Sequence, residues 1–128
     1  MKKEFIPYQQ ALELKELGFN EDCLGWYQDN TLRLDINSNQ SIKFHEHLGR
    51  FKGCLLAPLY QQCWRWFREK YGLIGWVCPF NNGKNESNNF LSYGFAIKNI
   101  FIGKTNFENY EEAELDCLKK LIEIVKNK

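Results

Sequence analysis

The sequence lacks any hydrophobic run near the length of a membrane-spanning helix, which needs about 18 consecutive apolar residues. Its first residues, Met1-Lys2-Lys3, are followed by Glu4 and by the polar pair Gln9-Gln10, so no signal peptide is expected. The chain also contains no Gly-x-Ser-x-Gly, His-Glu-x-x-His or glycine-rich phosphate-binding motif. We therefore expect a protein that has no membrane partner and is not an enzyme.

Paired metal-ligand motifs are missing as well, because the chain has neither a Cys-x-x-Cys nor a His-x-x-x-His pair. The five cysteines are Cys23, Cys54, Cys63, Cys78 and Cys117. Their odd number, wide spacing and apolar neighbours indicate reduced, mostly buried thiols in a cytosolic protein. The disulfide framework of a secreted protein is the weaker alternative, and no cofactor is predicted.

Aromatic residues, by contrast, are abundant, since four Trp, six Tyr and ten Phe make up 16% of the 128 residues. A small domain buries a limited share of its surface, so large rings are an efficient way to build its core. The rings that fall outside the most apolar predicted elements are candidates for a binding face: Trp26, Tyr27, Phe44, Phe51 and Trp76. A homo-oligomer would bury an outward Trp26 or Trp76.

Charge is sorted along the chain although the formal net charge is only +1. Residues 1–40 carry four positive and seven negative side chains, residues 41–105 nine positive and three negative, and residues 106–128 four positive and six negative. The middle of the chain is therefore basic and both ends are acidic, which favours an anionic partner for the middle segment.

The clearest predicted helix covers residues 110–126. Asn109 and Glu112 have the spacing of a capping box, and the acidic side chains of Glu111, Glu112 and Glu114 suit the positive end of the helix dipole. Its apolar stripe comprises Ala113, Cys117, Leu121 and Ile124, widened by Leu118, Ile122 and Val125. This pattern is typical of a structural helix that faces the core.

Two further helices are predicted, over residues 7–17 and 58–71. Pro58 suits a first helical turn, while Gly18 and Gly72 can each supply a left-handed stop. The second of these helices is apolar on two adjacent stripes, so we expect it to be covered on most sides.

Strands are predicted at 24–27, 32–36, 73–78 and 91–100, with a further short one at 42–44. Asp29-Asn30 is a hairpin turn sequence, and alternation points Leu32, Leu34 and Ile36 inward. The polar stretch 81–89 joins the second strand pair and is too short for a helical crossover, which excludes a Rossmann-like sheet. The predicted fold is a single α+β domain over residues 1–128, a two-layer sandwich of a mainly antiparallel sheet and about three helices in the order α-β-β-α-β-β-α.

A candidate partner-binding or anion-binding cluster lies in the basic middle segment. It comprises Lys43, His45, His47, Arg50 and Lys52. On a strand, His45 and His47 would share a face. A zinc site there would need further ligands from Cys54 or Cys23, and Cys54, which we expect in an accessible loop, is the best-placed candidate for a catalytic thiol. A surface pair of histidines that binds an anion or a partner is the favoured interpretation.

Nucleic-acid binding is the main alternative function. The run Trp64-Arg65-Trp66-Phe67-Arg68 has the composition of a stacking platform. Helical spacing, however, separates the rings from Arg65 and Arg68. The order α-β-β-α of the second half resembles a degenerate double-stranded-RNA-binding domain, but the glutamates that begin its last helix would repel phosphate.

Several segments resemble a group of small uncharacterised proteins from phages and prophages. The similar segments are Phe5-Ile6-Pro7-Tyr8, 14–19, 57–62, 66–73 and 110–123. The helix–hairpin–helix half is also similar to phage αβα-sandwich domains. The resemblance covers most of the chain, while 37–53 and 80–89 look variable.

The resemblance implies a viral origin, a location in the cytoplasm of a bacterial host and no housekeeping enzyme activity. We therefore expect a small, non-catalytic phage accessory protein that binds a host or viral protein, for example to counter host defence or to redirect host machinery. The alternatives are a nucleic-acid or nucleotide-binding protein that uses the basic middle segment, and a structural component of the virion.

Overall fold

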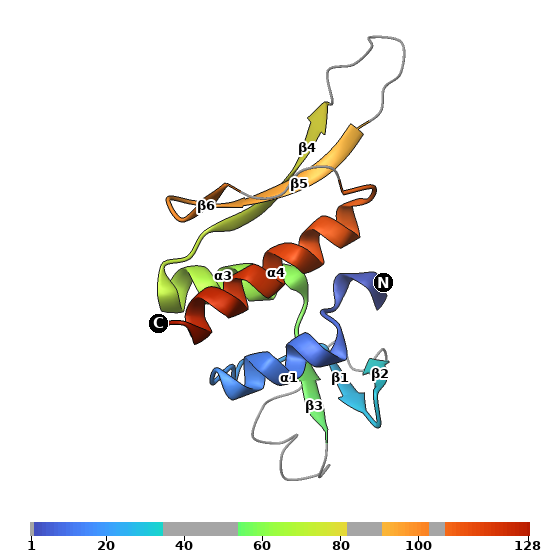
Figure 1. Ribbon diagram of the computed structural model, residues 1–128. Coiled ribbons are helices and arrows are strands. Elements are labelled where there is room, and N and C mark those ends of the chain that lie inside the picture. The colour runs from blue at the N-terminus through green and yellow to red at the C-terminus, as the bar shows by residue number, and fades with distance from the viewer. Residues whose placement is uncertain (1, 35–53, 82–90, 103–106) are drawn as a thin grey trace. The chain divides into compact units, whose positions relative to one another are not determined.

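The computed structural model describes residues 2–34, 54–81, 91–102 and 107–128, which form an α+β fold (Figure 1). The elements in chain order are a 3-10 helix η1 (Lys2–Glu4), α1 (Tyr8–Glu16), β1 (Gly25–Gln28), β2 (Thr31–Leu34), β3 (Leu55–Ala57), α3 (Tyr60–Tyr71), β4 (Gly75–Asn81), β5 (Leu91–Ile97), β6 (Phe101–Ile102) and α4 (Tyr110–Lys126). The strands form two antiparallel sheets, ordered β2-β1-β3 and β4-β5-β6. The predicted α+β class with antiparallel strands is confirmed.

The predicted order of elements needs a correction, because β3 lies between the first hairpin and α3 and β6 lies between β5 and α4, which gives α-β-β-β-α-β-β-β-α. The short β6 was also not predicted. The predicted strand at 42–44 lies outside the described residues. No helix in the described ranges is both long and apolar enough to cross a membrane.

The chain divides into two compact units, residues 1–63 and 64–128, and the boundary falls within α3. The prediction of a single domain over residues 1–128 stays a prediction, and each unit is described by itself.

The hairpin of the first unit is closed by Asp29 and Asn30, as the sequence predicts. Their φ angles of 51° and 66° are the left-handed values that a type I′ turn requires, and asparagine and aspartate tolerate them. The register pairs Gln28 with Thr31 across the turn. The expected alternation is present, since Leu32 is half-buried between exposed neighbours, whereas Ile36 lies outside the described residues.

The third strand of the first unit, β3, pairs with β1 on the side opposite β2. All of its three residues are buried. The sequence of β3, Leu-Leu-Ala, contains no β-branched residue and is too short to display an alternation, which is why the strand escaped prediction.

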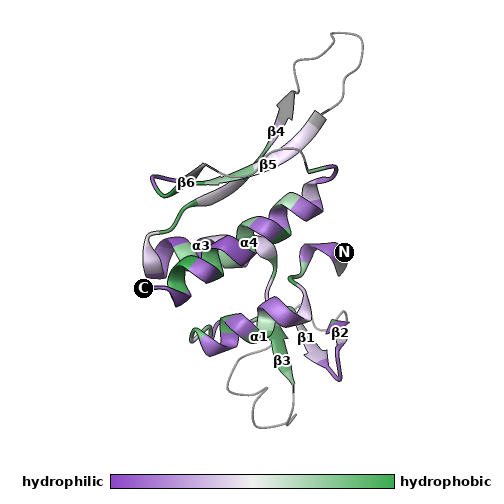
Figure 2. Ribbon diagram, viewed as in Figure 1, coloured by the Kyte–Doolittle hydropathy of each residue, from purple (hydrophilic) through white to green (hydrophobic). Residues whose placement is uncertain are grey.

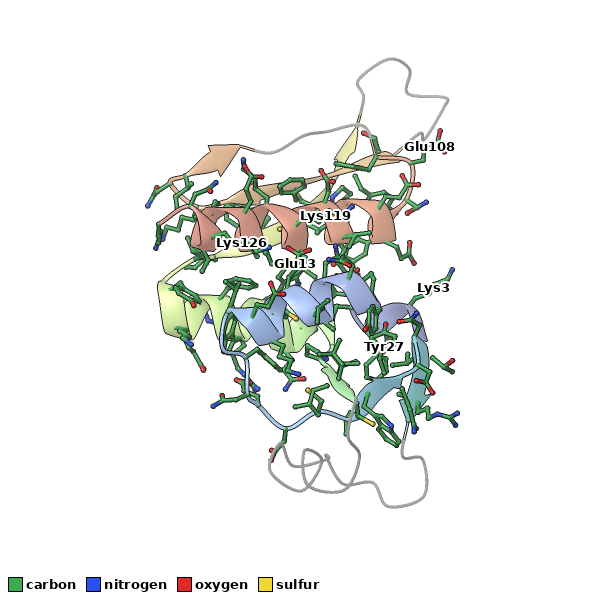
Figure 3. All side chains as sticks on the ribbon, turned by 60° about the horizontal axis from the view of Figure 1, so that its bottom comes forward. Lys3, Glu13, Tyr27, Glu108, Lys119 and Lys126 are labelled. Carbon is green, nitrogen blue, oxygen red and sulfur yellow. The ribbon has the colours of Figure 1, made fainter. Side chains whose placement is uncertain are left out.

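The N-terminal segment is fixed to this sheet by buried polar contacts. Figure 3 labels Tyr27, which lies on β1. Its hydroxyl donates to the Ile6 carbonyl at 2.6 Å, and the Ile6 amide donates to the Pro58 carbonyl at 3.1 Å. Burial raises the pKa of Tyr27. Of the aromatic residues considered for a binding face, Tyr27 therefore has a structural role.

In the second unit, α4 packs against one face of the β4–β5 hairpin (Figure 1). Gly75 permits this close approach, because a Cβ atom there would lie 3.0 Å from the Cys117 sulfur and 3.3 Å from the Leu121 side chain. Five of the seven residues of the predicted stripe on α4 are buried, namely Ala113, Cys117, Leu118, Leu121 and Ile122, whereas Ile124 and Val125 near the end of the helix are half-buried. Figure 2 shows the corresponding alternation of hydrophobic and hydrophilic residues along the helix.

The start of α4 confirms the predicted N-cap, because the Asn109 side chain accepts a hydrogen bond from the Glu112 amide at 2.8 Å. Glu114 differs from expectation. It is buried, whereas Glu111 and Glu112 are exposed. Glu114 precedes Cys117 by three residues and Leu118 by four, so helical geometry places it on the apolar stripe.

Candidate functional site

The binding cluster predicted from the sequence comprises Lys43, His45, His47, Arg50 and Lys52. All five residues lie outside the described ranges, as do Phe44 and Phe51. The cluster therefore stays a prediction, and a candidate surface has to be built from other residues.

Four of the five cysteines, all within the described ranges, are buried. Cys54 is buried rather than accessible, which corrects the prediction, and burial raises the pKa of its thiol, helped by Asp29 and opposed by Arg33. Burial also raises the pKa of Cys23 and of Cys117 to about 12. Since the thiolate is the nucleophile, a raised pKa disfavours catalysis by these groups. Within the described residues, no group of three or more His, Cys, Asp or Glu side chains could hold a metal ion.

The aromatic and basic residues of α3 lie on different faces of the helix, as predicted. Trp66 and Phe67 are buried, whereas Arg65 and Arg68 are exposed. The rings pack edge to face, with the centroids of Trp66 and Phe67 5.0 Å apart. The Lys70 ammonium lies 5.1 Å from the Trp66 ring centroid, an intramolecular cation–π contact. This helix uses its rings for packing and does not present them as a stacking platform.

The β4–β5 hairpin has a second face, which points away from α4. Because Gly75 faces α4, the residues next to it in the strand face the other way. The register pairs Trp76 with Ala96 and Cys78 with Gly94, and the Lys98 amide donates to the Ile74 carbonyl at 2.9 Å. We call the surface made by these residues the outer face: Ile74, Trp76, Cys78, Gly94, Ala96 and Lys98.

The outer face carries large exposed apolar side chains at one end. Trp76 is 43% exposed and Ile74 is 38% exposed, and Ile100, in the turn that follows β5, is 55% exposed. Beyond Trp76 the outer face is less accessible, since Cys78 and Ala96 are half-buried, Gly94 is buried and Ser92, further along the same face, is 1% exposed. The accessible part of the outer face is therefore the end with Ile74 and Trp76, where an opposing protein surface can cover the protruding ring.

One positive charge accompanies these apolar residues. In the stretches 73–81 and 91–102, Lys98 is the single charged residue of the sequence. Lys98 is exposed, and as the partner of Ile74 it lies on the same face of the hairpin. The described part of the outer face is therefore apolar with a cationic end.

The first unit offers no comparable surface among its described residues. Its large exposed apolar side chains are Tyr8, in the first turn of α1, and Leu24, which precedes β1. The Tyr8 ring packs edge to face on Tyr27, with the centroids 5.5 Å apart. Trp26, which was expected to point outward together with Trp76, is half-buried.

The sequence identified Trp76 as an outward ring but missed Ile74 and Ile100. The signal for Ile74 was available, because Ile74 and Trp76 are two residues apart in an extended segment and so share a face. Ile100 could not be recognised in advance, because its exposure depends on the end of β5 at Ile97 and on the turn at 98–100, where Asn99 has a φ of 64°.

Comparisons with protein-family models, with curated proteins and with solved structures each found no match to this chain. The resemblance to small phage proteins therefore stays a prediction.

Proposed function

We propose that this chain is a small, non-catalytic phage accessory protein that acts in the cytoplasm of a bacterial host by binding a protein through its outer face. The observation that carries the proposal is the exposed Trp76, which stands between Ile74 and the small residues of the β4–β5 hairpin. Tryptophan is enriched among the residues that contribute most to protein–protein binding, because its large ring buries much apolar area.

The charge of the outer face defines the chemistry of the partner. Lys98 is the single charged residue in the stretches 73–81 and 91–102. A complementary protein surface would therefore be apolar at its centre and carry a carboxylate at its rim. A rim charge of this kind contributes mainly to specificity and to the rate of association.

A nucleic-acid partner has weaker support from the described residues. The rings of α3 are taken up in packing, and the exposed Glu111 and Glu112 at the start of α4 would repel phosphate. One lysine on the outer face would neutralise few phosphates. The basic cluster from Lys43 to Lys52 is the feature that would favour nucleic acid, and it is outside the described ranges.

The proposal is tested by affinity purification from a bacterial lysate with the wild-type chain, Trp76→Ala and Leu24→Ala. Leu24 is a matched control because it is 44% exposed and lies in the first unit. We expect a protein that the wild type and Leu24→Ala recover and Trp76→Ala loses. Titration of the purified partner should then show that Trp76→Ala weakens binding by about 30-fold, corresponding to about 2 kcal/mol.

Charge reversal adds a second measurement on the same complex. Lys98→Glu should slow association and reverse its dependence on salt, because attraction to an acidic rim becomes repulsion, which salt screens. An interaction that Trp76→Ala leaves unchanged would contradict the proposal. A gel retardation of nucleic acid that weakens steeply with salt would favour the nucleic-acid alternative instead.

A further inference from the structure

The strand β4 lies at an edge of its sheet. The sheet order is β4-β5-β6, and among the described strands β4 pairs with β5 alone. An edge strand presents a row of backbone N–H and C=O groups that a further strand can pair with. What such a strand can bind depends on which residues point their backbone groups outward.

The register and three backbone contacts identify these residues. The Lys98 amide donates to the Ile74 carbonyl, so this pair is hydrogen-bonded across the β4–β5 ladder. On β5, the amide and carbonyl of Tyr93 both bond to Phe107, which places them on the side away from β4. Hydrogen-bonded and non-bonded pairs alternate in an antiparallel ladder. The backbone groups of Gly75, Val77, Pro79 and Asn81 therefore point away from β5, to the edge of β4 on which none of the described strands pairs, here called the free edge.

The free edge of β4 is long and has few of the features that prevent pairing. It covers seven residues, none of them charged. Natural edge strands are usually protected by charges, by short length or by proline. In β4 one of these protective features is present, namely Pro79, which has no backbone N–H to donate.

We propose that two copies of this chain associate through their β4 strands, antiparallel to each other about a two-fold axis at Cys78. The arrangement joins the two three-stranded sheets into one continuous sheet. Cys78 is the central residue of the strand, so this register is the one that overlaps the full length of β4 with itself. The same surface is used by both copies, as in an isologous interface.

The hydrogen bonds of this register follow from the outward residues. Gly75 faces Asn81 of the second copy, and each pair exchanges two backbone bonds. Val77 faces Pro79 of the second copy, and the Val77 amide donates to the Pro79 carbonyl. The reverse bond is absent because proline has no N–H. The two-fold axis repeats both pairs. Every outward-pointing backbone N–H and C=O group of Gly75, Val77, Pro79 and Asn81 is then hydrogen-bonded, except the Val77 carbonyl of each copy.

A second copy fits this edge better than a charged peptide would. The strand is uncharged and the formal net charge of the chain is only +1, so two copies meet without strong repulsion. Pairing also sets the two outer faces side by side, with Ile74 and Trp76 of each copy on one surface. The dimer would thus present the proposed binding face twice, although dimerisation does not depend on the proposed function.

Cys78 provides a direct readout of the register. Because Cys78 lies on the axis, it would face Cys78 of the second copy in a non-hydrogen-bonded pair, with the two Cα atoms about 4.5 Å apart. This separation lies within the range of about 4.4–6.8 Å that a disulfide bond allows. Cys78 is half-buried, whereas Cys23, Cys54, Cys63 and Cys117 are buried. Diamide, which takes up the two thiol hydrogens as the S–S bond forms, should therefore link two chains through Cys78.

The test combines this cross-link with analytical ultracentrifugation. We expect a concentration-dependent dimer and a diamide-linked dimer on a non-reducing gel that disappears in Cys78→Ser. Cys78→Ser should still sediment as a dimer. A wild-type chain that sediments as a monomer at every concentration tested would overturn the proposal. So would a dimer whose cross-link does not depend on Cys78.

Two proline substitutions on the same strand should act in opposite directions. Pro79→Ala restores an N–H opposite the Val77 carbonyl at both symmetric pairs, and it should tighten the dimer about tenfold. Val77→Pro removes the remaining bonds at these pairs and should abolish the dimer. It leaves the β4–β5 ladder intact because the Val77 amide points outward, which circular dichroism checks. Dimer affinity unchanged in Pro79→Ala would contradict the proposed register even if Val77→Pro failed to fold.

Discussion

The two sheets of this chain each have three antiparallel strands, ordered β2-β1-β3 and β4-β5-β6, and their edge strands differ. In the first unit the strands have four, four and three residues, and the two edges are β2, which carries Arg33, and the short β3. In the second unit β4 and β5 have seven residues each, and β4 forms an uncharged edge. Among the described strands, the first sheet is thus protected against further pairing, whereas the second leaves an edge and an apolar end of one face available. Within the described residues, this difference supports placing the proposed interaction surfaces in the second unit.

The largest effects are expected from truncations in the two cores. Leu14 on α1 and Leu121 on α4 are both fully buried, so Leu14→Ala and Leu121→Ala should each lower the free energy of unfolding by about 2–5 kcal/mol. Because α3 contributes buried residues on both sides of the unit boundary, we expect one shared unfolding transition in calorimetry. Two separate transitions, each sensitive to one substitution, would contradict the prediction of a single domain.

A matched pair of glycines sharpens the comparison of the two sheets. A Cβ at Gly25 would lie 2.9 Å from the side chains of Leu34 and Phe5, closer than the 3.0 Å from Gly75 to the Cys117 sulfur. Gly25→Ala should therefore cost about 1–3 kcal/mol of stability, more than Gly75→Ala. Urea denaturation checks the order, with Thr31→Ala at an exposed position of β2 as the control. A larger loss of stability in Gly75→Ala than in Gly25→Ala would show that the first sheet accommodates an added Cβ atom more easily than the second.

Each unit also contains a buried thiol whose titration couples stability to pH. Burial raises the pKa of Cys23 and of Cys117 from 9.0 to about 12. The folded state keeps these protons when the unfolded state loses them, so stability is complete below pH 9 and falls between pH 9 and pH 12. The slope approaches about 1.4 kcal/mol per pH unit for each thiol. Denaturation at several alkaline pH values should show a smaller slope in Cys23→Ala and in Cys117→Ala, and an unchanged slope would exclude the coupling.

The smallest expected effect concerns the ends of the helices. The Asn109 side chain caps α4, whereas α1 begins after Pro7 without a side-chain cap. Asn109→Ala should therefore lower stability by about 1 kcal/mol. Glu108→Ala, next to the cap and exposed, is the control and should have little effect in the same denaturation assay. Equal effects of both substitutions would show that the cap contributes nothing specific.

Local signals in the sequence predicted much of the fold. Asp29-Asn30 predicted the first hairpin because few residue types adopt left-handed backbone at two successive positions. Asn109 and Glu112 predicted the start of α4 for a similarly local reason. By contrast, β3 has no local signature, since its three residues are defined by pairing with β1. The burial of Cys54 beside it was missed for the same reason.

The candidate surfaces required information that is not local. Trp76 was recognised as an outward ring, but its neighbours on the outer face depend on the register of β4 against β5. The free edge of β4 likewise depends on which residues bond to β5. That Pro79 is one of the residues whose backbone points to the free edge follows from the alternation of hydrogen-bonded and non-bonded pairs between β4 and β5, and no pattern in the sequence indicates it.

The most direct test of an available edge in the second sheet is hydrogen exchange measured at low and at high protein concentration. The amides of Gly75 and Val77 point to the free edge of β4, whereas the Trp76 amide is part of the β4–β5 ladder. We expect protection of Gly75 and Val77 to rise with concentration, while protection of Trp76 and of the strands β1 and β2 stays constant. Exchange at Gly75 and Val77 that is independent of concentration would contradict the account.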